Sequence, residues 1–311
     1  MTKPLRFGVI TSRADDGAGW RARARRAEDL GYSSLLMPDH FQDQWAPLVA
    51  LTVAVEATVD LHVGTLVFAN DYRHPVVLAK ELATLDRASG GRLEVGLGAG
   101  WKRSDYDEAG LGYDRPGVRI ERMGEALDVM RALWSSADPV HFDGVHYQVD
   151  GAVGTPRPWR PAGPPICIGG GGQRILSLAA RVADVVSLNA TLSAGELGVD
   201  AASSATPRAF DEKIGWVRGA AGPRFDAIEL QCHCPFVTVT EDRDAIAERM
   251  AGAFGLTPRE AAGVPLLLLG TVDQLCETIE ERRDRYGFTY WIVPDDAMDA
   301  LAPVVARLAG T

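Results

Sequence analysis

The residue types best suited to proton transfer lie in the segment Pro38-Asp39-His40-Phe41, directly after a strand expected over residues 33–37. Histidine titrates near neutral pH and serves as a general acid or base in many enzymes. Asp39 could hold a cofactor group or take part in a local turn. In a barrel of parallel strands the active site forms at the strand ends, so we predict His40 as the catalytic residue.

A second segment, Gly169-Gly170-Gly171-Gly172-Gln173, follows a strand expected at 166–168 and opens a helix expected through Arg181. Glycines ahead of a helix expose backbone N–H groups, and the helix dipole adds positive potential behind them. Such a segment binds anions, most often phosphate. Its spacing matches neither a dinucleotide fingerprint nor a P-loop. Close packing of the backbone is the alternative interpretation.

A third segment, residues 92–101, is a strand that runs into Gly98-Ala99-Gly100. Glycine recurs at every second position, which leaves one face of the strand without side chains. Glycine inside a strand often marks the close approach of a ligand or of another backbone. Two interpretations therefore remain open: the floor and lip of a pocket for a large flat ligand, or a tightly packed barrel corner.

The elements that must position these segments alternate between strand and helix with short links, which predicts a parallel sheet with helical crossovers. Four such units occur within about 135 residues, which is the number of residues per unit expected for an eightfold α/β barrel of ~250 residues. We predict one (β/α)8 TIM-barrel domain over residues 1–311, with a hairpin near 140–160 and a variable insertion near 189–224. The expected strands cover residues 5–10, 33–37, 61–68, 92–98, 166–168, 184–188, 227–240 and 288–293.

Two further groups of polar residues are expected to be structural. Alternation along their strands places Arg6 and Glu94 on the inner face near the start of each strand, where we expect them to form an ion pair. Cys232-His233-Cys234 looks like a metal-binding fragment, but alternation along a strand sends His233 to the face opposite the two thiols. No second Cys/His pair stands nearby to complete a site, so we predict buried structural thiols and no metal.

Composition narrows the class of protein. The chain has 311 residues, of which 46% are hydrophobic and 24% charged, and a net charge of −10. An acidic chain lacks the basic footprint that nucleic-acid binding needs, so we expect no nucleic-acid partner. No apolar run approaches the ~20 residues of a membrane span. The N-terminus has no secretory pattern, so we expect a cytoplasmic protein.

Several segments together resemble the luciferase-like flavin and deazaflavin oxidoreductases. The resemblance is close over residues 5–190 and looser, but collinear, to the end, and it implies a (β/α)8 barrel with insertions. The segments that carry it are Pro38-Asp39-His40-Phe41, Gly64-Thr65, residues 72–81, residues 85–92 and residues 96–101.

The resemblance implies a flavin-like ring in the barrel mouth, belonging to FMN or to the deazaflavin coenzyme F420. Asp39-His40-Phe41 with Trp45 nearby is more like the deazaflavin branch, in which the aspartate contacts the cofactor head and the histidine lies near the hydride-transferring carbon. That branch often has a non-proline cis peptide after the third strand, here near Leu66-Val67. The predicted cofactor-binding residues are Asp39, Thr65, Leu66, Val67, Gly98, Ala99, Gly100, Gly169, Gly170, Gly171, Gly172 and Gln173.

The sequence departs from the F420-linked sugar-phosphate dehydrogenases of this family at Trp101, near which a glutamate serves those enzymes as an acid. Tryptophan cannot transfer a proton, so the resemblance favours a hydrophobic or aromatic substrate over a sugar phosphate. We predict a homodimeric F420-dependent oxidoreductase that moves a hydride to or from a small organic molecule. The alternatives are an FMN-dependent monooxygenase and a protein that binds a deazaflavin without turnover.

Overall fold

Eight parallel strands form a closed barrel in the computed structural model, which describes residues 3–192 and 199–311. Each strand pairs with its neighbours, and the pairing of β3 with β5 closes the ring, which confirms the predicted (β/α)8 fold. The short strand β4 (Phe68–Ala69) continues β3 and also pairs with β5. The barrel strands are β1 (Arg6–Ile10), β2 (Ser34–Met37), β3 (His62–Thr65), β5 (Leu93–Gly98), β8 (Ile166–Gly170), β9 (Val185–Leu188), β10 (Glu229–His233) and β13 (Phe288–Pro294).

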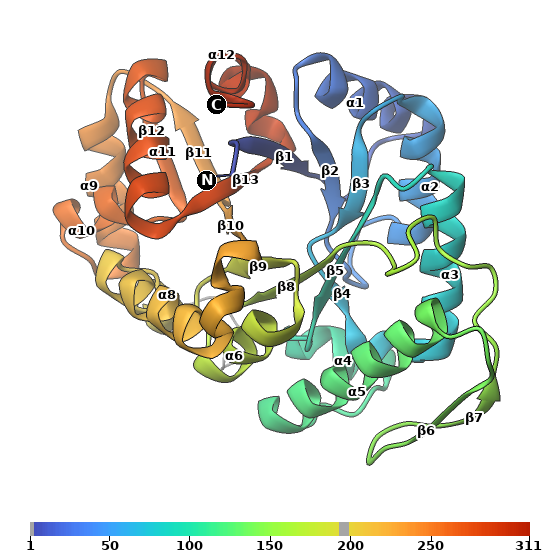
Figure 1. The fold of residues 1–311 in the computed structure, drawn as a ribbon. Helices are drawn as coiled ribbons and strands as arrows, with labels where there is room; N and C mark the ends of the chain where they lie inside the picture. The colour runs from blue at the N-terminus through green and yellow to red at the C-terminus, as the bar shows by residue number, and fades with distance from the viewer. Residues whose placement is uncertain (1–2, 193–198) are drawn as a thin grey trace.

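Helices surround the barrel on its outer side (Figure 1). Their buried residues recur at helical spacing, as in α6, where Ile175, Leu176 and Ala179 face the strands. Proline opens α2, α3, α5 and α8 at a position where its missing N–H costs nothing. The helices are α1 (Gly17–Asp29), α2 (Pro47–Ala57), α3 (Pro75–Ala88), α4 (Arg103–Ala109), α5 (Pro116–Ser135), α6 (Gln173–Val182), α7 (Val199–Ser203), α8 (Pro207–Ala221), α9 (Arg243–Phe254), α10 (Pro258–Gly263), α11 (Val272–Tyr286) and α12 (Met298–Leu308).

The prediction of one long strand over residues 227–240 is wrong. The chain leaves the barrel after β10, and Pro235 interrupts the run because it has no N–H to donate to a ladder. The remaining residues form β11 (Phe236–Val239), which pairs in parallel with β12 (Leu267–Gly270) in a separate sheet. Neither β12 nor the short helix α4 was expected from the sequence.

Both predicted insertions are present. The hairpin consists of β6 (Val140–Asp143) and β7 (Gln148–Ala152), paired antiparallel. The insertion after β9 contains α7 and the regular helix α8, whose residues Phe210, Ile214 and Val217 are buried on one face. Part of the insertion, residues 193–198, lies outside the described residues.

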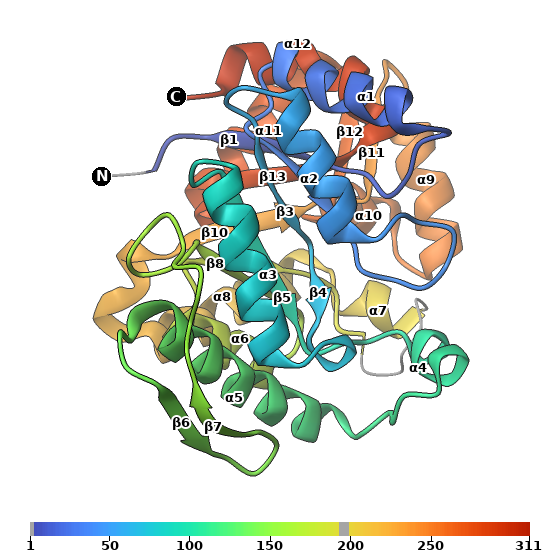
Figure 2. The ribbon, with the colours of Figure 1, turned by 90° about the vertical axis from the view of Figure 1, so that its right-hand side faces the viewer.

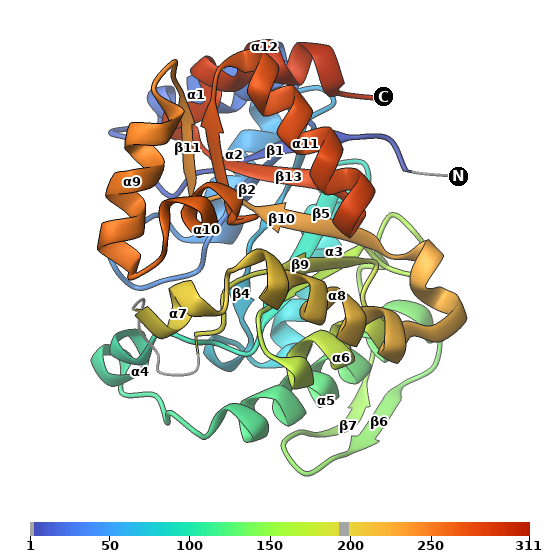
Figure 3. The ribbon, with the colours of Figure 1, turned by 90° about the vertical axis from the view of Figure 1, so that its left-hand side faces the viewer.

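The two ends of the barrel differ in what lies beside them. The chain termini lie on one side of the molecule, where backbone hydrogen bonds join Leu5 to Gly310 and Thr311, and α4, α7 and α9 lie on the other (Figures 2 and 3). We call the end at which the strands have their carboxyl termini the mouth, and the opposite end the bottom. Active sites of such barrels form at the mouth.

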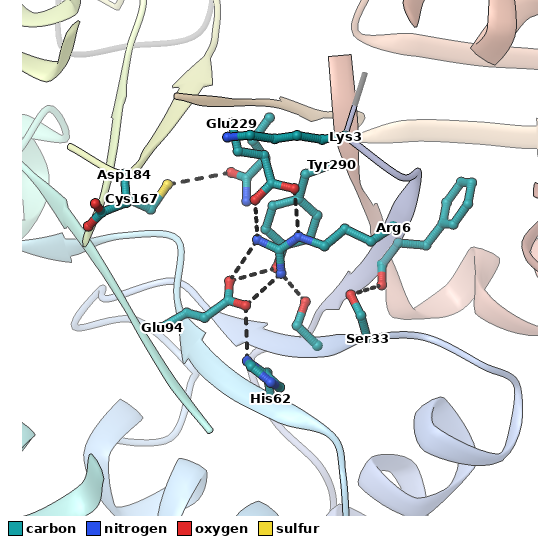
Figure 4. Close-up of polar contacts among 12 residues, drawn as sticks. Lys3, Arg6, Ser33, His62, Glu94, Cys167, Asp184, Glu229 and Tyr290 are labelled. Carbon is teal, nitrogen blue, oxygen red and sulfur yellow. Dashed lines mark hydrogen bonds and ion pairs between the residues drawn. The ribbon is translucent and has the colours of Figure 1, made fainter. Parts of the chain in front are cut away.

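The bottom of the barrel is filled by an ion-pair network (Figure 4), here called the bottom cluster: Arg6, His62, Glu94, Glu229 and Tyr290. The Arg6 guanidinium donates to Glu94 at 2.6 Å and to Glu229 at 2.5 and 2.8 Å, and it lies 3.4 Å from the Tyr290 ring centre. His62 lies 3.2 Å from Glu94. The expected ion pair of Arg6 with Glu94 is confirmed.

Candidate active site

His40 follows β2 at the mouth and is held by an acid that the sequence did not reveal. Its Nδ1 lies 2.6 Å from Oδ2 of Asp105, which belongs to α4 and has no exposed surface. A carboxylate at this distance accepts a hydrogen bond from Nδ1–H and so leaves Nε2 as the nitrogen with a free lone pair. Among the described residues Nε2 has no hydrogen-bond partner, so it is available to a substrate.

Two neighbours complete the surroundings of Asp105. Tyr72 donates from its hydroxyl to the same Oδ2 at 3.2 Å, and Lys102 places Nζ 3.7 Å from Oδ1. Burial, with Asp105 nearby, raises the pKa of Tyr72, so the tyrosine stays protonated and remains a donor. The ring of Trp101 stands edge-on to His40 with centroids 5.8 Å apart. His40 therefore has a fixed ring orientation and an aromatic neighbour at the mouth.

Asp39 is almost fully buried, and both of its carboxylate oxygens already have protein partners. Arg73 donates to them at 2.6 and 3.1 Å, and the Ala69 amide donates at 3.1 Å. This bidentate pair ties the end of β2 to the chain that follows β4. A contact between Asp39 and a cofactor stays a prediction.

The peptide bond between Leu66 and Val67 is cis, as the resemblance led us to expect. The Val67 side chain crosses toward β5, where a Cβ on Gly98 would lie 2.5 Å from Val67 Cγ2. A Cβ on Gly96 would lie only 1.8 Å from the carbonyl oxygen of Thr65. The glycine face of β5 is therefore covered by the neighbouring segment 65–67, as in the packed-corner interpretation. Leu66 and Val67 themselves keep accessible surface.

The lip after β5 needs glycine for a different reason. Gly100 has a φ of +75°, and a Cβ there would lie 1.8 Å from the hydroxyl of Tyr106. That hydroxyl donates to Asp71 at 3.1 Å, which fixes α4 below the lip. Ala99 and Gly100 are half-buried. Contacts of Gly98, Ala99 and Gly100 with a cofactor stay predictions.

Residues Gly169–Gln173, here called the glycine loop, connect β8 to α6 at the mouth. Gly172 caps the ten-residue helix α6 without any side-chain cap, so the first-turn N–H groups have no side-chain acceptor. Space beside Gly172 is open, because a Cβ there would meet no atom within 4 Å, whereas one on Gly171 would meet the Ala190 carbonyl oxygen at 2.2 Å. An uncapped helix start with open space in front fits a phosphate.

The chain after β9 supports the glycine loop. Thr191 donates from its hydroxyl to the Gly171 carbonyl at 2.9 Å. Lys213 of α8 is buried and donates to the carbonyls of Asn189 and Ser204 at 2.6 and 2.7 Å. Burial lowers the pKa of Lys213 to about 8. The lysine therefore joins α8 to the segment that lies against the glycine loop.

The mouth thus brings together the predicted residues from four strand ends, after β2, β3, β5 and β8. Trp45, in contrast, packs on Trp20 with ring centroids 5.4 Å apart and serves the core. The residues that sequence reasoning missed are Asp105, Tyr72, Arg73 and Lys102. The mouth thus holds a histidine fixed by a buried acid and a helix start without a side-chain cap, which suit proton transfer and the binding of an anionic group.

Comparisons with known proteins identify the family. The model of the luciferase-like monooxygenase family matches residues 5–289, and the chain belongs to this family. It is 30% identical over 306 residues to an F420-dependent glucose-6-phosphate dehydrogenase of Nakamurella multipartita, covering 94% of this chain and 84% of that protein. This result confirms the resemblance inferred from the sequence.

Solved structures share the fold. The F420-dependent tetrahydromethanopterin reductase from Methanopyrus kandleri superposes with a TM-score of 0.79 at 19% identity, covering 98% of both chains. An F420-dependent secondary alcohol dehydrogenase in complex with an F420–acetone adduct superposes with a TM-score of 0.77 at 20% identity, also covering 98% of both chains. Identities this low establish the barrel architecture alone.

Proposed function

We propose that the chain is an F420-dependent oxidoreductase that transfers a hydride between the deazaflavin and a small organic substrate. The observation that carries the proposal is the His40–Asp105 pair at the mouth, because a fixed basic nitrogen is what an alcohol–ketone type of interconversion needs for its proton. The relatives named above support F420 as the cofactor.

The residues at the mouth suit such a cofactor. The glycine loop would hold its phosphate, and the cis-linked Leu66 and Val67 would form the wall behind its ring. When bound, the deazaflavin supplies the hydride acceptor or donor. The protein holds the ring, orients the substrate and excludes water, while Asp39 stays engaged by Arg73 in the scaffold.

His40 would transfer the proton. Its Nε2 removes a proton from a substrate hydroxyl, or returns one to a substrate carbonyl oxygen, while hydride leaves or reaches the adjacent carbon. Asp105 stabilises the imidazolium that forms and keeps the ring in one orientation. Tyr72 donates to the same carboxylate and helps to hold it in place.

The substrate would be uncharged and at least partly apolar. Trp101 stands beside His40, where an acid would be needed for the sugar-phosphate reaction of the relatives. We therefore expect glucose 6-phosphate to be a poor substrate.

We further propose that residues 1–311 act as one cytoplasmic domain that forms a homodimer and binds no nucleic acid. Support for the dimer comes from Val49 on α2 and Val77 on α3, which are 69% and 53% exposed on neighbouring helices. Among the described residues, no helix is long and apolar enough to cross a membrane. Native mass spectrometry would test the dimer.

Side-by-side titration of the purified protein with F420 and FMN tests the cofactor. We expect saturable quenching of F420 fluorescence and at least tenfold weaker binding of FMN. Tighter binding of FMN would favour the monooxygenase alternative. Oxidation of alcohols by the loaded protein, monitored at the F420 absorbance, would separate an enzyme from a protein that only binds the cofactor.

A further inference from the structure

The Cys232-His233-Cys234 motif ends β10 and presents its histidine and its thiols to opposite sides. The two thiols lie 3.8 Å apart and contact the Pro265 carbonyl oxygen outside the barrel. Alternate residues of β10 point into the barrel, since Glu229 reaches Arg6 and Gln231 reaches the Cys167 thiol. By the same alternation His233, at the carboxyl end of the strand, points into the mouth.

His233 lies next to the predicted cofactor wall. Cys232 is in register with Leu188, the last pair of the ladder between β10 and β9, so His233 and Asn189 are the residues that follow this pair at the mouth. Asn189 in turn lies close to the wall, because a Cβ on Gly169 would meet Val67 Cγ1 at 3.4 Å and Asn189 Nδ2 at 3.7 Å. A ring resting on Val67 would therefore have Asn189 and His233 at one edge.

The protein leaves this polar pair without strong partners. Among the described residues, neither ring nitrogen of His233 has a hydrogen bond, although the side chain lies deep in the mouth and keeps some accessible surface. The Nδ2 of Asn189 makes only long contacts of 3.4 Å to Ser187. The polar atoms of His233 and Asn189 therefore keep hydrogen-bonding capacity that the protein itself does not use.

The chemistry of the pair selects an uncharged partner. Burial lowers the pKa of His233 to about 4, so the imidazole is neutral at physiological pH. A neutral imidazole offers one donor and one acceptor, and the Asn189 carboxamide offers both as well. Neither group carries a charge for a phosphate or a carboxylate, whereas together they match an edge on which carbonyl and N–H groups alternate.

We propose that His233, with Asn189 beside it, hydrogen-bonds the carbonyl–N–H edge of the bound flavin-like ring. The assignment rests on the proposed function, since it needs a ring at the mouth. F420 and FMN share this edge, so the contact contributes to affinity for either ring. His233 is thus a binding residue distinct from the proton-transferring His40 and from the glycine loop.

The test is the affinity of the full-length protein for F420, measured by fluorescence quenching. Since a neutral hydrogen bond contributes about 1 kcal/mol, we expect His233→Ala to weaken F420 binding about fivefold. His233→Gln retains a donor and an acceptor and should stay within about twofold of wild type. Cys232→Ser, which changes the outward face of the same strand, is the matched control and should bind F420 normally.

A second measurement keeps the proposal testable if His233→Ala folds poorly. In wild-type protein labelled with 15N-histidine, the ring nitrogen signals that His233→Gln removes should shift when F420 is added. Wild-type affinity in a folded His233→Ala variant, or unshifted signals, would overturn the assignment alone. A wild-type protein that binds neither F420 nor FMN would overturn the proposed function together with this assignment.

Discussion

The two ends of the barrel each hold a cluster of ionisable side chains, but they differ in how completely the protein satisfies them. In the bottom cluster, Arg6 lies between Glu94 and Glu229 and stacks on Tyr290, so its guanidinium is used on every side. At the mouth, His40 has one nitrogen held by Asp105 and one without a partner, and His233 has no partner among the described residues. The bottom is built for stability, whereas the mouth retains hydrogen-bonding capacity for a ligand.

Arg6→Met should have the largest effect, and on stability. The substitution removes the guanidinium that lies between Glu94 and Glu229, and breaking such a buried network costs about 3–5 kcal/mol of unfolding free energy. Chemical denaturation would measure the loss. Arg26→Met, which breaks an exposed pair with Asp299, is the control and should cost less than about 1 kcal/mol. Equal losses in the two variants would contradict the structural role of the bottom cluster.

His40→Asn should have the largest effect at the mouth, and on turnover. A general acid or base contributes about 10²–10⁴-fold to rate, so we expect turnover at saturating F420 to fall by at least ~10². Cofactor affinity should stay near wild type, because the proposed phosphate and ring contacts are made by other residues. Wild-type turnover in a variant that binds F420 normally would remove His40 from the reaction.

Asp105→Asn tests whether the hydrogen bond between His40 and Asp105 contributes to turnover. The amide can no longer stabilise an imidazolium, so we expect turnover to fall by at least ~10-fold and its dependence on pH near neutrality to change. Asp107→Asn changes an exposed residue of the same helix that pairs with Arg103, and it should leave both properties unchanged. A normal pH profile for Asp105→Asn would show that the acid only holds α4 in place.

Gly172→Asp tests the glycine loop without a clash. The site is open, and aspartate is a favourable helix cap, so the protein should fold normally. Its carboxylate would occupy the first-turn N–H groups and repel a phosphate, so F420 affinity should fall about tenfold, or 1.4 kcal/mol. Gly172→Asn, the uncharged control, should weaken binding less. Unchanged affinity for the aspartate variant would place the phosphate elsewhere.

The barrel could be predicted from the sequence because its signals are local. The eight strands could be predicted from the alternation of strand and helix patterns and from proline at helix starts. The pair of Arg6 with Glu94 could be predicted because alternate residues of a strand point into the barrel. The end of β10 was missed because the apolar alternation continues past Pro235, although the chain there leaves the barrel.

Only part of the candidate site could be predicted, because the remaining residues come from segments that are distant in the sequence. His40 and the glycine loop stand at strand ends and could be found by position. Asp105 lies 65 residues from His40, on a seven-residue helix too short to show a period. The sequence also could not show whether a ligand or the protein itself covers the glycine face of β5, because the covering residues Thr65 and Val67 come from a neighbouring part of the sheet.

The two ends should also lose stability in different ranges of pH. Burial alone would raise the pKa of Glu94, but Arg6 and His62 lower it to about 2. The contribution of Glu94 to stability is therefore present above pH 4.5 and is lost as the pH falls toward 2.

At the mouth, burial lowers the pKa of His233 to about 4. The unfolded chain takes up that proton below about pH 6.5 while the folded chain does not, so stability falls between pH 6.5 and 4. Since the side chain keeps accessible surface at the mouth, we expect a loss of about 1 kcal/mol. Urea unfolding at pH 7, 5.5, 4 and 3 should show a smaller loss between pH 7 and 4 for His233→Gln than for wild type, with the further decline from pH 4 to 3 retained in both. If the variant lost as much stability between pH 6.5 and 4 as wild type, His233 would be as solvated in the folded chain as in the unfolded chain. His40 alone would then support the contrast between a bottom cluster whose hydrogen bonds are made and a mouth that keeps hydrogen-bonding groups free.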